Sequence, residues 1–429
     1  MREDKRRDDA LVRDWMADRR PLRLPMLRVT HVSHEKRLAG GPAGYTYRLE
    51  KAFAEVSDPA FQVNFFVLKR REQTKWFRFK ASLRDYYQRA RVRCRLQSRY
   101  ELHLKGRLAL TKTVETSDPR IWDSDLVILH NPILAENILR HRRPGPIVAM
   151  ISHSPTPMFA ELGGDENPQY LLDDCLRHRY LASLASRELR SYQSFDFILA
   201  PCREAHEAYF ACGPDWVKAF GEDKLRYCLT GTQPPEVIQS ADSWRKSLGV
   251  SADQLLAVYV GRNHPHKGTD LLFEALHRLD PETRKRVVVA FAGFKEQGPE
   301  LPNARYIGYT NDVGGLVSAS DFVINANRYT YFDLLTLEVL SLSKPLLATQ
   351  TGGNVVLAQL APGVKLVLPT TEDLVKGIQF FAQLNSAGRK EMGEANYSAW
   401  QKHFSPAVFA KQHLSVYDNI FKEAKSRNQ

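Results

Sequence analysis

Long hydrophobic runs are missing from this sequence of 429 residues. Its longest apolar stretches, such as LLAVYVG and RVVVAFAG, fall far short of the roughly 18 residues that a membrane-spanning helix needs. The first stretch, MREDKRRDDALVRDW, also lacks the apolar core of a secretory signal peptide. The sequence therefore predicts a cytoplasmic protein.

Cysteine is scarce, and its spacing shows no metal-binding or disulfide pattern. The five cysteines, at positions 94, 175, 202, 212 and 228, include no C-x-x-C pair, which favours reduced thiols over a disulfide or zinc framework. With 43% hydrophobic and 26% charged residues the chain has the composition of an ordinary globular protein. Its length indicates two or three domains.

Acidic residues are nearly absent from one segment. Between Lys69 and Lys112 the chain carries 15 Lys or Arg residues and three acidic ones. Basic and acidic residues balance in the rest of the chain, so this segment alone supplies the formal net charge of +12. Such a concentration needs a local explanation.

Helical periodicity arranges part of this segment as an aromatic stripe between two cationic flanks. At ~100° per residue, Trp76, Phe79 and Tyr86 fall on one face. We predict that the helix binds an anionic membrane surface, through Trp76, Arg78, Phe79, Arg84, Tyr86, Arg89 and Arg91. The alternative is a helix that packs on its own domain and exposes a solvated basic face. No nucleic-acid-binding motif accompanies the charge, so no nucleic-acid partner is predicted.

From Leu27 onward, β-rich runs alternate with helical patterns, which is typical of βα units around parallel sheets. A Pro-Pro pair predicts a linker over 231–247. We expect an α/β protein with two doubly wound, Rossmann-like domains and an interdomain cleft. The predicted strands are 27–33, 61–68, 125–130, 146–152, 195–200, 225–230, 254–261, 286–293, 304–309, 321–326, 344–350 and 364–368. The predicted parts are a charged extension (1–26), a first domain (27–230) with the basic insert (69–112), the linker, a second domain (248–404) and a terminal helix (405–429).

The motif GRNHPHKG follows a buried strand of the second domain. Arg262 stands at the carboxyl end of that strand, where ligands of open α/β sheets bind, and Lys267 stands where a helix opens. This pair fits one anionic group, or else a surface salt bridge. His264 and His266 flank a proline in the same loop and are not predicted to bind metal.

A second motif, NRYTYFDLLTLEVLSLSKPLLATQTGGN, follows the strand at 321–326. It predicts a polar turn, a helix that carries Glu338, a strand and a Gly-Gly turn. Thr330 is the predicted helix cap, and free amides near Phe332, Asp333 and Leu334 could receive a phosphate. The alternative is that Thr330 and Asp333 only cap the helix while Glu338 pairs with a cation.

Together the two motifs resemble the donor half of the GT-B fold retaining glycosyltransferases of family 4, or group 1 glycosyltransferases. The resemblance covers 254–400 and, more weakly, 27–230. It implies that Arg262 and Lys267 bind the donor diphosphate, that Glu338 grips the nucleotide ribose and that Thr330 to Asp333 face the sugar. Tyr309 is a candidate neighbour of the base. The family has a first acid where this chain has Thr330 and usually a Gly where it has Asp333, a departure that bears on the donor sugar and on activity.

The amino half offers weaker signals. Gly40 and Gly41 permit close backbone approach of a ligand at a helix start, or form a plain tight turn. His153 follows the strand at 146–152 and resembles the family's cleft histidine, with a predicted sugar or acceptor role. Asp123 and Asp125 have the D-x-D spacing of a divalent-metal site, but they precede a strand at the end away from the cleft, and no metal is predicted.

We therefore predict a metal-independent, retaining hexosyltransferase-like enzyme without a cofactor, peripheral on the inner face of the membrane. It would move a sugar from a nucleotide diphosphate sugar to a lipid-linked or growing polysaccharide acceptor in cell-surface glycan synthesis. His153, Arg262 and Lys267 are its predicted catalytic residues. The alternatives are a non-catalytic scaffold of a glycan-assembly complex, a nucleotide-sugar 2-epimerase and a nucleic-acid-binding protein.

Overall fold

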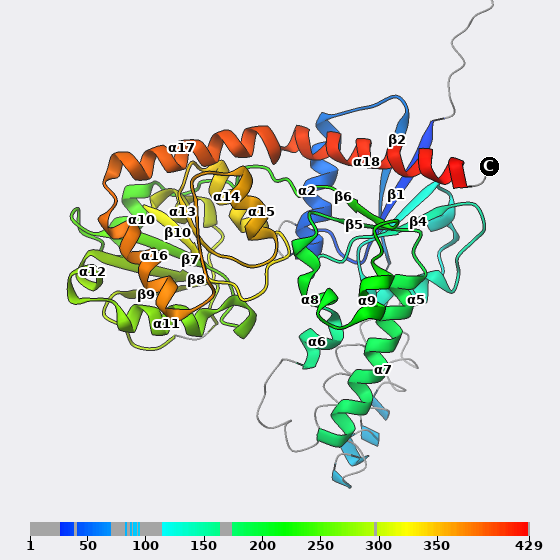
Figure 1. Cartoon of the computed structure of the whole chain (residues 1–429), viewed down its shortest axis with the longest axis horizontal. Helices are drawn as coiled ribbons and strands as arrows, with labels where there is room; N and C mark the ends of the chain where they lie inside the picture. The colour runs from blue at the N-terminus through cyan, green and yellow to red at the C-terminus, as the bar shows by residue number, and fades with distance from the viewer. Residues whose placement is uncertain are drawn as a thin grey trace, which may run out of the picture.

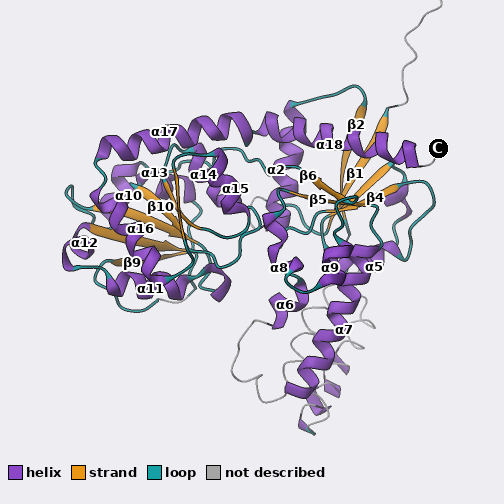
Figure 2. Ribbon diagram, in the orientation of Figure 1, coloured by secondary structure: helices purple, strands orange, loops and turns teal. Residues whose placement is uncertain are grey.

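The computed structural model describes residues 26–37, 41–69, 82–83, 86–87, 89–91, 93–94, 114–163, 174–295 and 298–427. Two parallel six-stranded sheets, each flanked by helices, lie side by side in the molecule (Figures 1 and 2). The two predicted doubly wound units are confirmed. All twelve predicted strands form, with ends within three residues of those expected.

The first sheet has the strand order β2-β1-β3-β4-β5-β6. Its strands are β1 (Leu27–Ser33), β2 (Phe61–Val67), β3 (Leu126–Leu129), β4 (Ile147–Met150), β5 (Phe197–Ala200) and β6 (Leu225–Tyr227). The helices of this half are α2 (Gly41–Glu55), α5 (Pro132–Leu139), α6 (Met158–Gly163), α7 (Asp174–Gln193), α8 (Glu207–Phe210) and α9 (Pro214–Ala219).

The second sheet has the order β12-β11-β10-β7-β8-β9. Its strands are β7 (Leu255–Val260), β8 (Val287–Ala292), β9 (Ala304–Gly308), β10 (Phe322–Asn325), β11 (Leu346–Thr349) and β12 (Val364–Val367). Its helices are α10 (Ala241–Ser247), α11 (Thr269–Arg278), α12 (Pro281–Arg286), α13 (Val313–Ala319), α14 (Leu334–Ser341), α15 (Gly353–Leu360), α16 (Thr371–Gln383) and α17 (Ser386–His403). Strands such as β8, VVVAFA, are buried along their whole length because helices cover both faces of the sheet.

The strand orders locate where each sheet binds ligands. In a doubly wound sheet the chain reverses its direction of winding at one point, and the crevice outside the carboxyl ends of the strands there is the usual ligand site. In the second sheet this point lies between β7 and β10, and in the first sheet between β1 and β3. The four loops that follow these strands are therefore the first places to look for a site.

The residues expected to form the linker divide into two parts. Residues 228–239 contain no helix or strand, whereas 241–247 form α10. Trp244 is buried in the core of the second sheet, and its Nε1 donates to Asp312 at 2.7 Å. The helix α10 therefore belongs to the second half, because its Trp244 side chain is buried in the core of that half.

The terminal helix forms as α18 (Pro406–Arg427) and packs on the first half of the chain. It lies against α2 above the first sheet, while α17 lies on the second (Figure 1). Phe409, Tyr417 and Ile420 are fully buried in the core of the first sheet. The chain therefore crosses between the halves twice, once at 228–239 and once between α17 and α18.

Most of the basic segment lies outside the described residues, including Trp76, Arg78, Phe79 and Arg84. Of the predicted stripe, Tyr86 is described, and it is 74% exposed. In the described part of the chain, no helix combines the length and apolar character that a bilayer span requires.

Candidate functional site

The loops after β7 and β10 meet at the switch point of the second sheet. The Lys267 ammonium lies 2.9 Å from the Asp333 carboxylate. Asn327 and Asn325 also donate to this carboxylate, at 2.7 and 3.2 Å. Gly268 permits the close approach of the two loops, because it has a φ of +61° and a Cβ there would lie 1.9 Å from the Ala326 carbonyl oxygen.

The charge state of Asp333 follows from these contacts. Burial opposes its ionisation, but the Lys267 ammonium and the two asparagine amides hold the pKa of its carboxyl below the ordinary value. Asp333 is therefore an anion that faces the predicted diphosphate lysine. The Asp333 carboxylate thus occupies the position beside Lys267 where the sequence predicts the diphosphate of a ligand.

Arg262, unlike Lys267, has a guanidinium that no other described side chain binds. It is exposed at the end of β7, and its guanidinium makes no ion pair or hydrogen bond with any residue that the structure describes. The two cations lie on one loop, which the 3-10 turn Pro265–Lys267 leads into α11. The structure thus places one unpaired and one paired cation at the switch point.

Thr330 does not cap α14. The residue before the helix is Asp333, whereas the Thr330 hydroxyl is buried and lies 3.0 Å from that of Thr351. Asn354 donates to the same hydroxyl at 3.3 Å. The Gly-Gly turn packs directly against this loop. A Cβ on Gly352 would lie 1.8 Å from the Thr330 carbonyl oxygen, so this close approach requires glycine. Thr330 is therefore a structural link between two loops, and the expected cap was wrong because its hydroxyl bonds across the loop instead of along the helix.

The other residues of this predicted site range from buried to exposed. Phe332 is buried and packs on Phe404, with ring centroids 5.9 Å apart. Leu334 is half-buried at the first position of α14, and Tyr309 is 67% exposed after β9. Their predicted contacts with a donor stay predictions.

Glu338 pairs with Arg48 of α2, on the other half of the chain. The two side chains are 11% and 8% exposed. Burial raises the pKa of Glu338, and the Arg48 guanidinium opposes this rise. Arg48 also donates to the Thr232 hydroxyl at 2.8 Å, so this ion pair lies beside the segment that joins the two halves. The carboxylate predicted to grip a ribose thus holds the two halves together.

In the first half, the predicted residues lie around the ends of β1 and β4. Gly40 lies outside the described residues, and Gly41 is the first residue of α2. His153 has a φ of +57°, which a residue with a side chain adopts only at a cost in energy. Its ring packs at a tilt against that of Tyr45, with centroids 4.5 Å apart, and lies 6.3 Å from that of Tyr331 of the second half. His153 therefore lies where the two halves meet.

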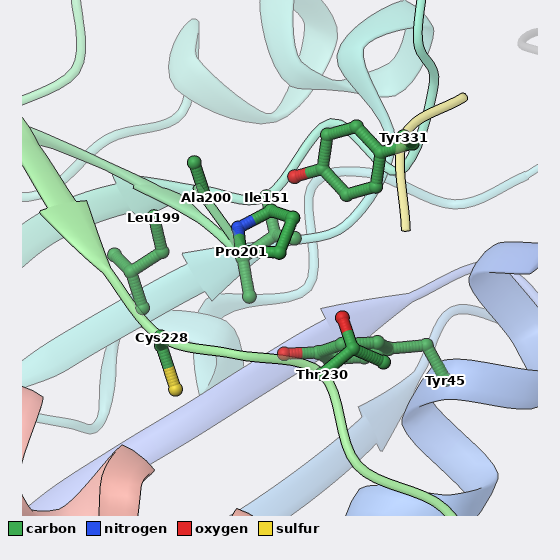
Figure 3. Close-up of a pocket in the computed structure, with 8 residues that line it drawn as sticks. All are labelled: Tyr45, Ile151, Leu199, Ala200, Pro201, Cys228, Thr230 and Tyr331. Atoms are coloured by element: carbon green, nitrogen blue, oxygen red, sulfur yellow. The ribbon is translucent and has the colours of Figure 1, made fainter. Parts of the chain in front are cut away.

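A small cavity lies at the same junction, between the ends of β5 and β6 and the loop that carries Tyr331 (Figure 3). Its volume of about 10 Å³ corresponds to a single water-sized sphere, which is too small for a sugar. The Tyr331 hydroxyl is buried there without a hydrogen-bond partner in the described part of the chain. Tyr45, Cys228 and Thr230 complete its polar lining.

The sequence analysis missed Arg48, Asn325 and Asn327. The two asparagines stand at the end of β10, which is a signal that could have found them. Arg48 had no such signal, because it lies on α2 and meets Glu338 across 290 residues of chain. The D-x-D pair also has a structural role here, since Asp125 accepts from the Arg28 backbone amide at 2.7 Å. Among the described residues, no three His, Cys, Asp or Glu side chains are arranged to hold a metal ion.

Comparison with known proteins finds a family match in the second half of the chain. Residues 254–383 match the model of the glycosyl transferases group 1. A D-inositol 3-phosphate glycosyltransferase from Saccharomonospora viridis is 31% identical over 129 residues, which are 25% of this chain and 30% of that protein. The chain spans less than two fifths of the length of the curated relatives it matches.

Solved structures resemble the chain over almost its whole length. Sucrose-phosphate synthase from Thermosynechococcus elongatus covers 92% of this chain and all of its own, with a TM-score of 0.60 at 15% identity. Anabaena Alr3699/HepE in complex with UDP covers the same shares, with a TM-score of 0.56 at 12% identity. At these identities the likeness concerns the fold, and it confirms the predicted GT-B architecture of two Rossmann-like domains.

Proposed function

We propose that the protein is a glycosyltransferase that takes a sugar from a nucleotide diphosphate sugar. The observation that carries this proposal is the pair of cations, Arg262 and Lys267, at the switch point of the sheet in the part of the chain that matches the glycosyl transferases group 1. The fold neighbour Anabaena Alr3699/HepE has been solved with UDP and with UDP-glucose, which supports a nucleotide sugar as donor.

The chemistry follows from where negative charge develops. When the bond between the sugar and the diphosphate breaks, charge accumulates on the leaving phosphate oxygens. Cations fixed beside those oxygens stabilise the transition state more than the ground state. Arg262 supplies a forked donor and Lys267 a point charge, so the protein itself meets this charge without a metal ion. We further propose transfer with retention of configuration, as the resemblance to family 4 implies.

In this structure the predicted ligand-binding side chains pair with other side chains of the protein, an arrangement that we call the self-paired state. A donor has to compete with these pairs in order to bind. Asp333 occupies Lys267, and Arg48 occupies Glu338. For Lys267 to bind a phosphate, it must exchange the Asp333 carboxylate for the ligand. We propose that Asp333 weakens donor binding and shapes the choice of donor. The rival proposal of a non-catalytic scaffold draws on the same pairing.

Our proposals for the acceptor and for the cellular location depend on the basic segment. We propose a lipid-linked or growing polysaccharide acceptor, reached at the inner face of an anionic membrane. The concentration of positive charge between residues 69 and 112 and the exposed ring of Tyr86 support this proposal.

Replacement of either cation tests the function itself. Arg262→Ala and Lys267→Ala are each expected to reduce turnover at least tenfold, equivalent to ~1.4 kcal/mol of lost transition-state stabilisation. The wild type is expected to be stabilised thermally by UDP or another nucleoside diphosphate in a panel of nucleotides and nucleotide sugars. Arg278→Ala is the matched control, because this arginine is half-exposed at the last position of α11 and pairs with Glu274 at 2.6 Å. If the folded wild type binds no nucleotide in the panel, the scaffold explanation replaces the enzyme.

Substitution of Asp333 tests the self-paired state. Asp333→Asn keeps the side-chain size and removes the charge, so Lys267 becomes free and the affinity for free nucleoside diphosphate is expected to rise by roughly fivefold to tenfold. Isothermal titration of wild type and variant with the same nucleotide measures this change. An unchanged or lower affinity would show that Asp333 does not compete with the ligand.

Vesicle sedimentation tests the membrane proposal. The wild type is expected to sediment with anionic vesicles, to bind neutral ones poorly and to be released as salt screens the attraction over roughly 3 Å at 1 M. Charge reversal at Arg78, Arg84, Arg89 and Arg91 should abolish this binding and leave nucleotide binding intact. Equal recovery with neutral and anionic vesicles, or none with either, would favour the helix with a solvated basic face.

A further inference from the structure

Four histidines and two tyrosines form one hydrogen-bonded chain through the first half of the protein. His153 Nε2 lies 2.7 Å from His130 Nδ1, and His130 Nε2 lies 2.7 Å from His31 Nδ1. His31 Nε2 lies 2.7 Å from the Tyr417 hydroxyl. The chain thus begins at the interdomain junction and runs through the ends of β4, β3 and β1 into α18.

The chain then turns back toward its start. The Tyr417 hydroxyl lies 3.0 Å from His413 Nδ1, and His413 Nε2 lies 2.7 Å from the Tyr45 hydroxyl. The ring of Tyr45 packs at a tilt against that of His153, so the last member of the chain touches the first. We call these six side chains the histidine relay: His153, His130, His31, Tyr417, His413 and Tyr45.

Three histidine rings of the relay, those other than His153, are buried and neutral. His31, His130 and His413 are at most 1% exposed, and burial lowers the pKa of each of them, to about 3 for His130 and His413. A neutral imidazole has one N–H donor and one acceptor nitrogen. Because each of these three rings uses both nitrogens within the relay, the position of the proton on one ring fixes its position on the next.

Three arrangements of protons satisfy every link. In the first, all four histidines carry the proton on Nε2 and donate toward Tyr45. In the second, all four carry it on Nδ1, and the donation runs from the Tyr45 hydroxyl to His153. In the third, the Tyr417 hydroxyl accepts from both His31 Nε2–H and His413 Nδ1–H, so His153, His130 and His31 carry the proton on Nε2 and His413 carries it on Nδ1.

The buried hydroxyls of the relay decide between these arrangements. Tyr45 is 5% exposed, and among the described residues its hydroxyl has no hydrogen-bond partner other than His413 Nε2. In the first arrangement its proton would have no acceptor among the described residues, which is costly for a buried hydroxyl. The third arrangement has the same cost at the fully buried Tyr417, whose hydroxyl proton would have no acceptor among the described residues. In the second arrangement the Tyr45 hydroxyl donates to His413, and the Tyr417 hydroxyl donates to His31. The only group then without a protein partner is the Nδ1–H of His153, which lies at the half-buried interdomain junction and can donate to a ligand.

We propose that the histidine relay fixes His153 as a hydrogen-bond donor, through Nδ1–H, to an oxygen atom of the bound nucleotide sugar. This proposal rests on the proposed function for its ligand. His130, His31, His413 and Tyr417 are positioning residues, which act on the ligand only through the tautomer and orientation of His153. A His153 fixed in this way does not accept the proton of the incoming acceptor hydroxyl, because its acceptor nitrogen is used by His130.

The proton positions can be measured without any ligand. Nitrogen-15 NMR of histidine-labelled full-length protein distinguishes Nδ1–H from Nε2–H, and single histidine variants assign the signals. The wild type near pH 7.5 is expected to show His31, His130, His153 and His413 all as Nδ1–H. Four Nε2–H rings would reverse the relay and make His153 an acceptor, and a mixture of tautomers would mean that donation does not run from Tyr45 to His153. Either result overturns the proposal.

Removal of one hydroxyl tests the functional part. Tyr417→Phe breaks the relay between His31 and His413 while keeping the ring in the core, so His153 is expected to lose its single tautomer. Turnover should fall roughly tenfold, with the affinity for free nucleoside diphosphate unchanged, because the second half holds that part of the ligand. Tyr306→Phe is the matched control, since it removes a hydroxyl that donates at 2.7 Å to the Pro299 carbonyl in the other half.

The outcomes separate the two proposals. A single Nδ1–H tautomer in a protein that binds no nucleotide would overturn the proposed function and the role of His153 toward a sugar, but not the relay. Normal turnover in Tyr417→Phe, with the His153 tautomer altered, would remove the role in transfer. If this variant does not fold, Tyr45→Phe breaks the relay at its other end, and the same readouts apply to it.

Discussion

Lowering the pH from 7.5 to 5.5 is expected to destabilise the protein by about 3 kcal/mol or more through its buried histidines. His130, His206 and His413 are at most 1% exposed, and burial lowers the pKa of each to about 3. In the unfolded chain they titrate near 6.5. The unfolded state therefore takes up protons below pH 6.5 while the folded state does not, and stability is lost as the pH falls from 6.5 toward 3.

The size of the effect follows from these values. At pH 5.5 each of the three histidines contributes a loss of ~1.4 kcal/mol, and His31, whose pKa burial also lowers, adds to it. Glu188 acts in the opposite direction, because burial raises the pKa of its carboxyl to about 7 and the folded state gains a proton over the same range. Its contribution to the pH dependence of stability offsets that of about one histidine. The net loss is a large part of the ~5–15 kcal/mol that stabilises a typical domain.

Urea unfolding at constant ionic strength between pH 7.5 and 5.5 measures this loss. Glu188→Gln removes the opposing carboxyl and should make the pH dependence steeper. His413→Gln should lower the stability at pH 7.5 but make the dependence shallower, because one titrating group is gone. A free energy of unfolding that stays constant over this range in all three proteins would contradict the burial of neutral histidines.

Arg48→Ala is expected to cost about 3–5 kcal/mol of stability and to lower the melting temperature by about 10 °C. The substitution leaves the Glu338 carboxylate buried between the two halves without its cation. Removal of one partner of a buried ion pair is far more costly than removal of both, since the remaining charge loses its compensation. Thermal unfolding of the full-length protein measures the change.

The double variant Arg48→Met/Glu338→Leu provides the decisive comparison. It replaces both charges by apolar side chains of similar size and should recover most of the lost stability. Arg278→Ala is the control for an exposed pair, because Arg278 and Glu274 are 51% and 46% exposed and their pairing is worth less than about 1 kcal/mol. If Arg48→Ala is no less stable than this control, Arg48 and Glu338 do not hold the two halves together. Nucleotide titration of the double variant tests the ribose role of Glu338 separately, through a loss of affinity.

The location of the predicted cations and of Asp333 could be read from strand ends in the sequence. Arg262 and Lys267 follow a strand whose continuous apolar run marks it as buried, and Asp333 follows another. Carboxyl ends of parallel strands share one edge of the sheet, so the sequence could predict that these residues lie on the same side. It could not show that Asp333 would pair with Lys267, because that distance depends on how closely the two loops pack at Gly268.

By itself the sequence determined the class of fold, the twelve strands and the position of the cationic loop, because each of these depends on patterns of apolar and polar residues within a few neighbouring positions. The tertiary structure alone decided the pairing of Arg48 with Glu338 and the assembly of the histidine relay. His31 and Tyr417 are 386 residues apart, and they meet only because α18 crosses back onto the first sheet. No local pattern records such a contact, since it results from the packing of whole elements and not from the preferences of the residues that make it.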